Sequence, residues 1–292
     1  MGMRSAWAGS SATAWSTKRV NQIKRLYLEG TGLQLCCVDF GGDGSPVLLL
    51  HGLAGRAAEW RNTASWLTTT HHVFALDQRG HGMSDRAPDD FSRDAYVSDV
   101  IRVMESLALG PAILIGQSMG GLNAFLAAAR RPELVRALIV AEASPAESPR
   151  VQQGVQDWLS SWPLPFPTLA DARVFFGGET LYAQTWLEVL EEHADGYWPQ
   201  FDQTTMVRSM ADVALRDYWQ EWEQVRCPTL IVGGADSFLS QDLLREMATR
   251  VPLGTYRQIA QAGHDVHLDQ PAEWRAVVTA FLQELMDTVR TS

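Results

Sequence analysis

The 292-residue sequence has few cysteines and no long uninterrupted apolar run. Its three cysteines are an adjacent pair, Cys36 and Cys37, and a distant Cys227. This is not the spacing of a disulfide framework or a zinc site, so we expect reduced thiols and a cytoplasmic location. No apolar run reaches the length of about eighteen residues that a membrane-spanning helix needs, and no membrane span is expected.

Positive charge is also scarce, since 24 basic residues stand against 34 acidic ones and the net charge is −10. Such a balance argues against nucleic acid or an anionic membrane as the partner. We expect a small-molecule substrate, and a protein that is a monomer or a homodimer. Residues 1–22 lack the apolar core of a secretory signal. We predict that they form a flexible N-terminal extension of a bacterial protein.

What the sequence does contain is an alternation of short apolar runs with segments of helical periodicity. Residues 25–29 and 33–39 flank a glycine turn and predict a β-hairpin. Further strands are expected at 47–50, 72–76, 112–116, 137–141, 229–233 and 254–260, and helices at 57–68, 92–108, 119–130, 240–250 and 271–289. The pattern predicts an α/β fold with a doubly wound, mostly parallel sheet covered by helices on both faces.

The alternation stops in a segment rich in proline and tryptophan. Helices are expected there at 150–160, 168–176, 179–193 and 203–225. We therefore predict a helical cap at residues 145–226, inserted into an α/β core made of residues 23–144 and 227–292. Residues 145–225 hold thirteen acidic residues and four arginines, so the cap carries most of the net charge. If some of these acids line the entry, they disfavour anionic substrates.

One motif indicates a nucleophile. The sequence Gly116-Gln117-Ser118-Met119-Gly120 follows an apolar run and precedes an alanine-rich helical segment. This is the strand–turn–helix context of a nucleophile elbow, in which Ser118 would stand exposed above the sheet. The pentapeptide alone is a weak signal, because a serine nucleophile also needs a base, an acid and an oxyanion hole.

Candidates for the base and the acid follow two later strands. His264 comes after the strand at 254–260 and Asp236 after the strand at 229–233, and functional residues gather at the carboxyl ends of parallel strands. The order Ser, Asp, His is that of nucleophile-elbow enzymes. Two alternatives remain open: Glu142 for Asp236, and His267 for His264, although the preceding glycine favours His264.

Four motifs together support a family resemblance: His51-Gly52, Asp77-Gln78-Arg79-Gly80-His81-Gly82, the elbow, and Gly263-His264. With them, residues 24–290 resemble an α/β-hydrolase-fold enzyme with a cap. The resemblance implies a Ser118–His264–Asp236 triad.

The sequence also predicts an oxyanion hole and the residues that support it. The Met119 backbone N–H, one residue after the nucleophile, is one expected oxyanion donor. The resemblance places the second donor at the Leu53 N–H, with Ala54 as the alternative. His51 is expected to buttress this loop or to contact the substrate. Three further residues (Asp77, Arg79 and His81) are expected to fix a loop through hydrogen bonds.

The predicted activity is that of a serine hydrolase that cleaves a carboxylic ester, lactone or thioester of a hydrophobic substrate through an acyl-enzyme. Trp162, Phe175 and His51 are the candidate pocket residues. We expect no metal and no cofactor. Carbon–carbon bond hydrolases and cofactor-free haloperoxidases share the elbow, and a non-catalytic ligand-binding relative is a further alternative. Ser118 excludes the aspartate-nucleophile chemistry of epoxide hydrolases and haloalkane dehalogenases.

Overall fold

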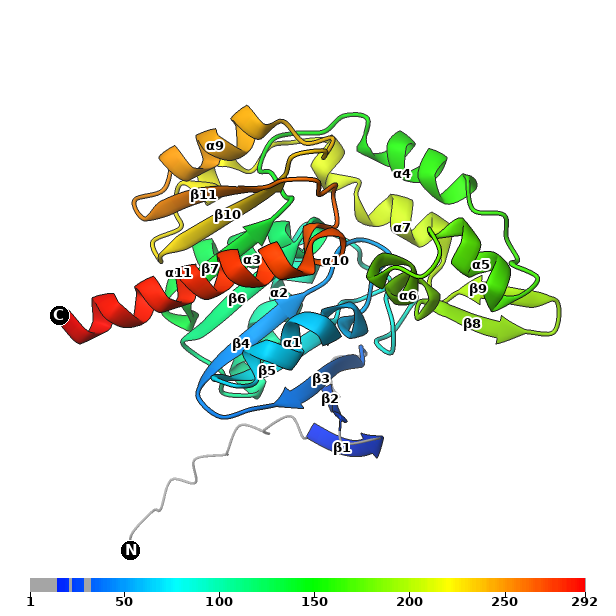
Figure 1. Ribbon diagram of the computed structural model, residues 1–292, viewed down its shortest axis with the longest axis horizontal. Helices are drawn as coiled ribbons and strands as arrows, with labels where there is room; N and C mark the ends of the chain where they lie inside the picture. Colours follow the sequence, from blue (N-terminus) through cyan, green and yellow to red (C-terminus); the bar gives the residue numbers. More distant parts are fainter. Residues whose placement is uncertain (1–14, 21–22, 29–32, 292) are drawn as a thin grey trace, which may run out of the picture.

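A sheet of nine strands organises the chain in the computed structural model, which describes residues 15–20, 23–28 and 33–291. Its strands are β1 (Trp15–Val20), β2 (Ile23–Leu28), β3 (Leu35–Gly41), β4 (Ser45–Leu50), β5 (His71–Asp77), β6 (Ala112–Gln117), β7 (Val135–Ala141), β10 (Thr229–Gly234) and β11 (Gly254–Ile259). They lie in the order β1-β2-β3-β5-β4-β6-β7-β10-β11 (Figure 1). Along this order, the neighbours from β1 through β2 and β3 to β5 pair antiparallel. The neighbours from β5 through β4, β6, β7 and β10 to β11 pair parallel. The predicted mostly parallel sheet is confirmed.

The N-terminal segment differs in part from the expectation. Residues 15–20, predicted to lie in a flexible extension, form β1 and pair with β2. Residues 1–14 and 21–22 lie outside the described residues. The predicted hairpin is present as β2 and β3, although its turn at residues 29–32 also lies outside them.

Helices cover both faces of the sheet, as predicted (Figure 1). One face packs against η1 (Ala57–Trp60), α1 (Arg61–Leu67), α10 (Val266–Asp269) and α11 (Pro271–Thr291). The other packs against α2 (Arg93–Ser106), α3 (Met119–Arg130) and α9 (Gln241–Thr249), while η2 (Pro132–Leu134) precedes β7. Alternate strand residues enter opposite layers: Val47 and Leu49 join the first, and Leu48 and Leu50 the second. This period of two on continuous apolar strands produces the two buried layers.

Residues 145–226, the predicted cap, are less regular than expected. They contain α4 (Val151–Ser160), α5 (Leu169–Phe175), α6 (Leu181–Leu187), β8 (Leu190–His193), β9 (Gly196–Pro199), α7 (Gln203–Ser209), η3 (Asp212–Ala214) and α8 (Trp219–Trp222). The helix predicted at 179–193 ends early, and β8 pairs with β9 instead. The long helix predicted at 203–225 is three short pieces.

The last of these pieces belongs to the main core. Trp222 packs edge-on against Phe125 of α3, with ring centroids 5.2 Å apart, and its indole N–H donates to the Met247 carbonyl oxygen at 2.9 Å. Tyr218 and Val225 are buried in the same layer. The apolar residues that suggested one long helix therefore pack against two different bodies, and the helix breaks between them.

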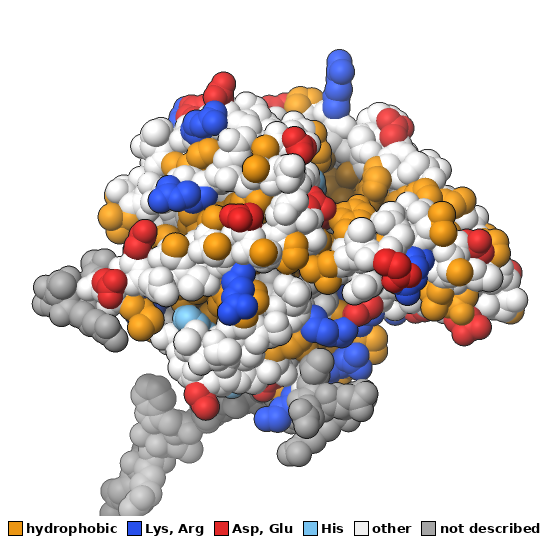
Figure 2. Space-filling model, viewed as in Figure 1, with side chains coloured by type: hydrophobic (Ala, Val, Ile, Leu, Met, Phe, Trp, Pro, Cys, Tyr) orange, Lys and Arg blue, Asp and Glu red, His pale blue; other side chains and the backbone are white. Residues whose placement is uncertain are grey.

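Within the described ranges, no helix is both long and apolar enough to cross a membrane. Hydrophobic side chains gather where residues 145–209 meet the sheet and its helices, and the surface is hollowed there (Figure 2). Because this hollow lies beyond the carboxyl ends of the parallel strands, we expect the functional site there.

Candidate functional site

Ser118 lies at a sharp turn between β6 and α3. Its φ of 51° is in the left-handed region, and its N–H donates to the Ala141 carbonyl oxygen at 2.9 Å. A Cβ on Gly116 would collide with the Gly120 backbone, and a Cβ on Gly120 would collide with the Leu50 carbonyl. The two glycines of the motif are therefore needed for close backbone approach, and the strand–turn–helix geometry predicted for the elbow is present.

A hydrogen-bonded chain links Ser118 to a histidine and a buried carboxylate. His264 lies between β11 and α10, and its Nε2 is 2.9 Å from Ser118 Oγ. Its Nδ1 is 3.1 Å from Glu142 Oε2. The Glu142 side chain is fully buried, whereas that of His264 is 27% exposed. With its proton on Nδ1, the imidazole donates to Glu142 and leaves Nε2 to accept the serine proton.

The Glu142 carboxylate is fixed by two further donors. The Gly234 N–H donates to Oε1 at 2.6 Å, and the Ser237 hydroxyl donates to Oε2. Both come from the end of β10 and the loop that follows it. Ser237 was missed by the sequence analysis, because a lone serine in a loop carries no signal of its own.

The predicted acid, Asp236, is not the partner of His264, and this prediction was wrong. Asp236 is exposed, and its backbone N–H is bound to the Ala262 carbonyl oxygen at 2.9 Å. Glu142, left open as the alternative, occupies the place next to the imidazole. Glu142 follows β7, which lies farther from β11 than β10 does, and its longer side chain reaches across beneath Gly234.

The loop after β4 lies against the nucleophile. A Cβ on Gly52 would be 3.5 Å from the Ser118 Cβ, so the backbone that leads to Leu53 passes close to the serine. Met119 is the first residue of α3, where backbone N–H groups have no partner within the helix. Both predicted oxyanion donors are therefore in the neighbourhood of Ser118, and their role stays a prediction.

His51 supports this loop and does not face a substrate. Its Nε2 accepts from the Gln78 N–H at 2.9 Å, and its Nδ1 donates to the Gly52 carbonyl oxygen at 2.7 Å. The ring is completely buried, and burial lowers the pKa of His51 to about 4. Its inclusion among the candidate pocket residues was wrong, because both nitrogens are used and no edge is accessible.

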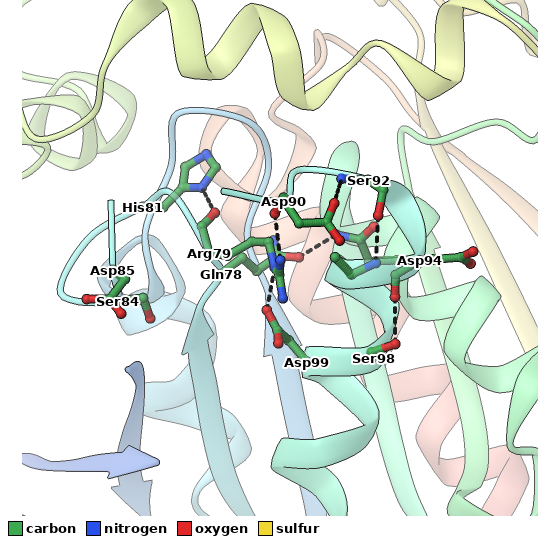
Figure 3. Close-up of polar contacts among 12 residues, drawn as sticks. Gln78, Arg79, His81, Ser84, Asp85, Asp90, Ser92, Asp94, Ser98 and Asp99 are labelled. Carbon is green, nitrogen blue, oxygen red and sulfur yellow. Dashed lines mark hydrogen bonds and ion pairs between the residues drawn. The ribbon is translucent and has the colours of Figure 1, made fainter. Parts of the chain in front are cut away.

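The loop after β5 is held by charged and ring groups, as predicted (Figure 3). Arg79 donates from Nε to Asp99 at 2.6 Å and from a terminal nitrogen to the Asp90 carbonyl oxygen at 2.6 Å. His81 donates from Nδ1 to the Arg79 carbonyl oxygen at 2.9 Å and accepts the Ala54 N–H at 3.1 Å. Burial lowers the pKa of His81 to about 3, so it is a neutral acceptor. His81 thereby ties this loop to the one that follows β4.

The two predicted cap aromatics lie in different surroundings. Trp162 is buried inside the cap among aromatic rings, the nearest of them Phe176 with centroids 5.0 Å apart. Phe175 packs beside it and is 42% exposed. It is Trp186 that lines a small cavity together with Leu53. Trp186, which the sequence did not distinguish from the other tryptophans, is therefore one of the cap residues that meet the loop after β4.

Arginines of the core bind acidic and carbonyl groups of the cap. Arg61 pairs with Glu188 at 2.6 Å, and Arg86 contacts both carboxylate oxygens of Glu191 at 3.0 Å. Arg56 donates to the Glu188 carbonyl oxygen at 2.7 Å. These two cap acids are bound to the core, which reduces the charge left to act on a substrate.

The described residues offer neither a metal site nor a second candidate nucleophile among the cysteines. There, no group of three or more His, Cys, Asp or Glu side chains is placed to hold a metal ion. The three cysteines are free thiols, and burial raises the pKa of Cys36 to about 12 and that of Cys227 to about 11. A thiol with a raised pKa is a poor nucleophile, which leaves Ser118 as the candidate.

Comparison with known proteins agrees with the fold. A family model described as alpha/beta hydrolase fold matches residues 45–271. The chain is 28% identical over 259 residues to the sn-1-specific diacylglycerol lipase ABHD11 of Danio rerio, covering 84% of this chain and 80% of the relative. It is 28% identical over 261 residues to the (E)-2-((N-methylformamido)methylene)succinate hydrolase of Acinetobacter baylyi, covering 83% and 92%.

Solved structures show the same fold. One is an E-2-(acetamidomethylene)succinate hydrolase, with a TM-score of 0.76, 23% identity and coverage of 92% of this chain and 100% of the other. Another is the enol-lactonase from Burkholderia xenovorans LB400, with a TM-score of 0.73, 20% identity and coverage of 88% and 99%. The named relatives are hydrolases, which supports the hydrolase class for this chain. The chain belongs to the α/β hydrolase fold family.

Proposed function

We propose that the protein is a serine hydrolase that cleaves a carboxylic ester, lactone or thioester through an acyl-enzyme on Ser118. In this proposal His264 is the general base and Glu142 orients it. The observation that carries the proposal is the continuous chain from Ser118 Oγ to His264 Nε2 and from His264 Nδ1 to Glu142. A serine hydroxyl is a weak nucleophile at its own pKa, and this chain supplies the base that it needs.

The proposed reaction has two halves. His264 takes the Ser118 proton as Oγ attacks the acyl carbon, and then gives it to the leaving alcohol or thiol. Water then attacks the acyl-enzyme, with His264 again as the base. Glu142 holds the imidazole with its Nδ1 proton directed at the carboxylate and stabilises the imidazolium that forms in each half.

The backbone N–H groups of Leu53 and Met119 are the proposed oxyanion donors. They would bind the negative charge that develops on the carbonyl oxygen in both tetrahedral intermediates. The loss of one such donor costs about 3–4 kcal/mol in the barrier. Support for this pair comes from the close approach of Gly52 to Ser118 and from the position of Met119 at the start of α3.

An uncharged, apolar acyl or ring group is the proposed substrate feature. The Phe238 ring lies against the His264 ring with centroids 4.6 Å apart and a tilt of 34°, and Phe238 is 78% exposed, so it offers an apolar surface beside the imidazole. Arg56, on the loop after β4, is engaged with the cap. The diacylglycerol lipase and the enol-lactonase among the similar proteins support an ester or a lactone as the bond that is cleaved.

Turnover of p-nitrophenyl acetate and p-nitrophenyl butyrate tests the proposal, together with labelling by a fluorophosphonate probe. Wild-type protein should hydrolyse both esters and take up one label, and the Ser118→Ala variant should do neither. The absence of turnover and of labelling in folded wild-type protein would refute the proposal and support a ligand-binding role. Full activity in Ser118→Ala would also refute it.

A second candidate is hydrolysis of an amide-bearing unsaturated dicarboxylic acid. It is favoured by the names of two similar proteins, both of which are methylenesuccinate hydrolases. The same serine and histidine would act on an amide carbonyl. A panel containing (E)-2-(acetamidomethylene)succinate beside the neutral esters separates the two, since kcat/KM should be higher for the class that the site fits.

A further inference from the structure

A network of three polar side chains leads from the loop after β4 to the cap. The His51 carbonyl oxygen accepts from the side-chain amide of Gln78, directly after β5, at 2.7 Å. The Gln78 Oε1 accepts from the Asn123 amide of α3 at 2.6 Å. The Asn123 Oδ1 in turn accepts from Arg93 of α2 at 2.7 Å, and a second terminal nitrogen of Arg93 donates to the Ser209 carbonyl oxygen at the end of α7. We call the side chains of Gln78, Asn123 and Arg93 the buried polar network.

The network is shielded from solvent along its whole length. Asn123 is completely buried, and Gln78 and Arg93 are each 2% exposed. A buried amide that loses one partner keeps an unsatisfied polar group, since no solvent reaches it to replace the bond. A break at one link therefore disturbs the link beside it.

The two ends of the network determine how each amide is turned. A backbone carbonyl can only accept a hydrogen bond, and a guanidinium can only donate. Gln78 must therefore direct its NH₂ group at His51 and its oxygen at Asn123. Asn123 must direct its NH₂ group at Gln78 and its oxygen at Arg93. Any amide turned the other way would place two donors or two acceptors against each other, so only one arrangement satisfies every group.

The loop end of the network lies where the backbone passes the nucleophile. Gln78 binds His51 twice, because its backbone N–H also donates to the His51 Nε2 at 2.9 Å. The next residue, Gly52, runs so close to Ser118 that a Cβ on the glycine would be 3.5 Å from the serine Cβ. The peptide that leads to the Leu53 N–H is therefore held by Gln78 at its start.

The cap end of the network carries a buried positive charge. The Arg93 guanidinium lies over the Tyr96 ring, 4.7 Å from its centroid, and donates to the oxygens of Asn123 and Ser209. The Arg93 backbone N–H donates to the Asp212 carboxylate of η3 at 2.6 Å. A buried charge is costly unless its donors are used, and here they join the cap to the amides of the core. The charge thus has a purpose beyond filling space.

We propose that Gln78 and Asn123 are positioning residues for the oxyanion hole. With Arg93 they link the cap to the His51 peptide, and so they hold the Leu53 N–H in place beside the nucleophile. The inference rests on the proposed serine-hydrolase function. It makes the geometry of the oxyanion hole depend on a contact with the cap.

Steady-state kinetics of the full-length protein with p-nitrophenyl butyrate test the inference. Gln78→Leu removes the link to His51. Asn123→Asp keeps an acceptor for Arg93 and places a carboxylate beside its charge, but it cannot donate to Gln78. Both variants should lower kcat about 10–100-fold with KM within about threefold, because a displacement of about 1 Å near the reacting atoms can cost about 100-fold in rate.

A pH profile distinguishes an effect on the oxyanion hole from an effect on the base. Neither Gln78→Leu nor Asn123→Asp changes His264 or Glu142, so the apparent pKa of the kcat/KM profile should remain that of the wild type. The rate of fluorophosphonate labelling should fall together with kcat.

A double-mutant cycle tests whether the links act as one unit. Arg93→Met breaks the network at the cap end and should lower kcat about 5–50-fold, since it acts on the same loop from farther away. Combined with Gln78→Leu, it should cost about as much kcat as the more damaging single variant. Losses that multiply would show two independent effects and would overturn the link to the cap.

A matched control separates positioning from general destabilisation. Thr63→Val on α1 removes a buried oxygen that accepts the Trp274 indole N–H at 3.1 Å. Its thermal stability should fall while kcat stays within about twofold of wild type, because the lost hydrogen bond lies outside the site. Asn123→Asp retains a partner for Arg93, so the inference stays testable if Gln78→Leu does not fold.

The outcomes of the two proposals are distinct. The positioning role is overturned if a folded Gln78→Leu or Asn123→Asp variant keeps more than half of the wild-type kcat, or if Thr63→Val loses as much kcat as they do. A shifted apparent pKa in these variants would also overturn it, because the effect would then act on His264. If wild-type protein itself neither turns over esters nor takes up the fluorophosphonate label, the failure is that of the proposed function.

Discussion

The identity of the acid that acts on His264 can be tested with two substitutions that each replace a carboxylate by an amide. Glu142→Gln keeps the size of a side chain that is fully buried. Its amide group would have to meet the imidazole, the Gly234 N–H and the Ser237 hydroxyl with one acceptor and two donor hydrogens. The imidazole would then carry its proton on Nε2, where it can no longer accept the proton of Ser118.

The expected loss follows from that change of tautomer. An amide in place of the acid of a serine triad lowers kcat about 10⁴-fold. This corresponds to about 5.5 kcal/mol in the activation barrier. Asp236→Asn changes an exposed side chain and should leave kcat/KM within about twofold, as surface substitutions do.

The assay is kcat/KM for p-nitrophenyl butyrate, with the rate of fluorophosphonate labelling as a second readout. Thermal unfolding of both variants provides the control for folding. The proposed role of Glu142 is refuted if Glu142→Gln keeps a third or more of the wild-type kcat/KM while it is folded. A hundredfold loss in Asp236→Asn would restore the acid that the sequence predicted.

Three further predictions concern the frame around the site. Ser237→Ala should lower kcat about 3–30-fold with KM unchanged, because the Glu142 carboxylate loses one of its donors; equal kcat in both proteins would show that this donor is dispensable. Gly120→Ala should give insoluble or inactive protein, since its Cβ would collide with backbone, and an active, stable variant would contradict the elbow geometry. Stability should fall on acidification from pH 7 to pH 5. His51 and His81 have folded pKa values of about 4 and 3, below the unfolded value of 6.5, so stability present above pH 6.5 is lost as pH falls. The loss should be about 2 kcal/mol for each histidine, measured by urea unfolding as the difference in pH dependence between the wild type and a His81→Gln variant, because buried acids with raised pKa values, Glu59 at about 8 and Asp265 at about 6, act in the opposite direction. An equal pH dependence in the two proteins would contradict the neutral buried state of His81.

The sequence predicted the sheet and its helices well, because the spacing of apolar residues in a strand or an amphipathic helix indicates both the type of element and the face that is buried. The elbow and His264 could be predicted for a similar reason, since each lies directly after a recognisable strand. The choice between Asp236 and Glu142 could not be made, because both follow strands that end at the same edge of the sheet. Which of them reaches the imidazole depends on the direction of each side chain after its strand.

The segment between β7 and β10 was less predictable for a different reason. Apolar residues at helical spacing in 203–225 indicate that these side chains are buried, but they do not indicate which part of the protein they pack against. Met206 is buried in the cap, whereas Trp222 is buried against α3, and the chain turns between the two.

The position of Glu142 directly after β7 has a consequence for how the enzyme could diversify. The end of β10 and the loop that follows it contribute Gly234 and Ser237 as fixed supports, but the loop tip carries Phe238, which is largely exposed and lies against the His264 ring. Since the carboxylate proposed to orient His264 comes from another strand, the tip can change in size and polarity without altering the contact between Glu142 and His264. A library randomised at position 238 alone would therefore vary selectivity on a constant catalytic apparatus, which makes this loop tip a natural starting point for engineering new substrate ranges.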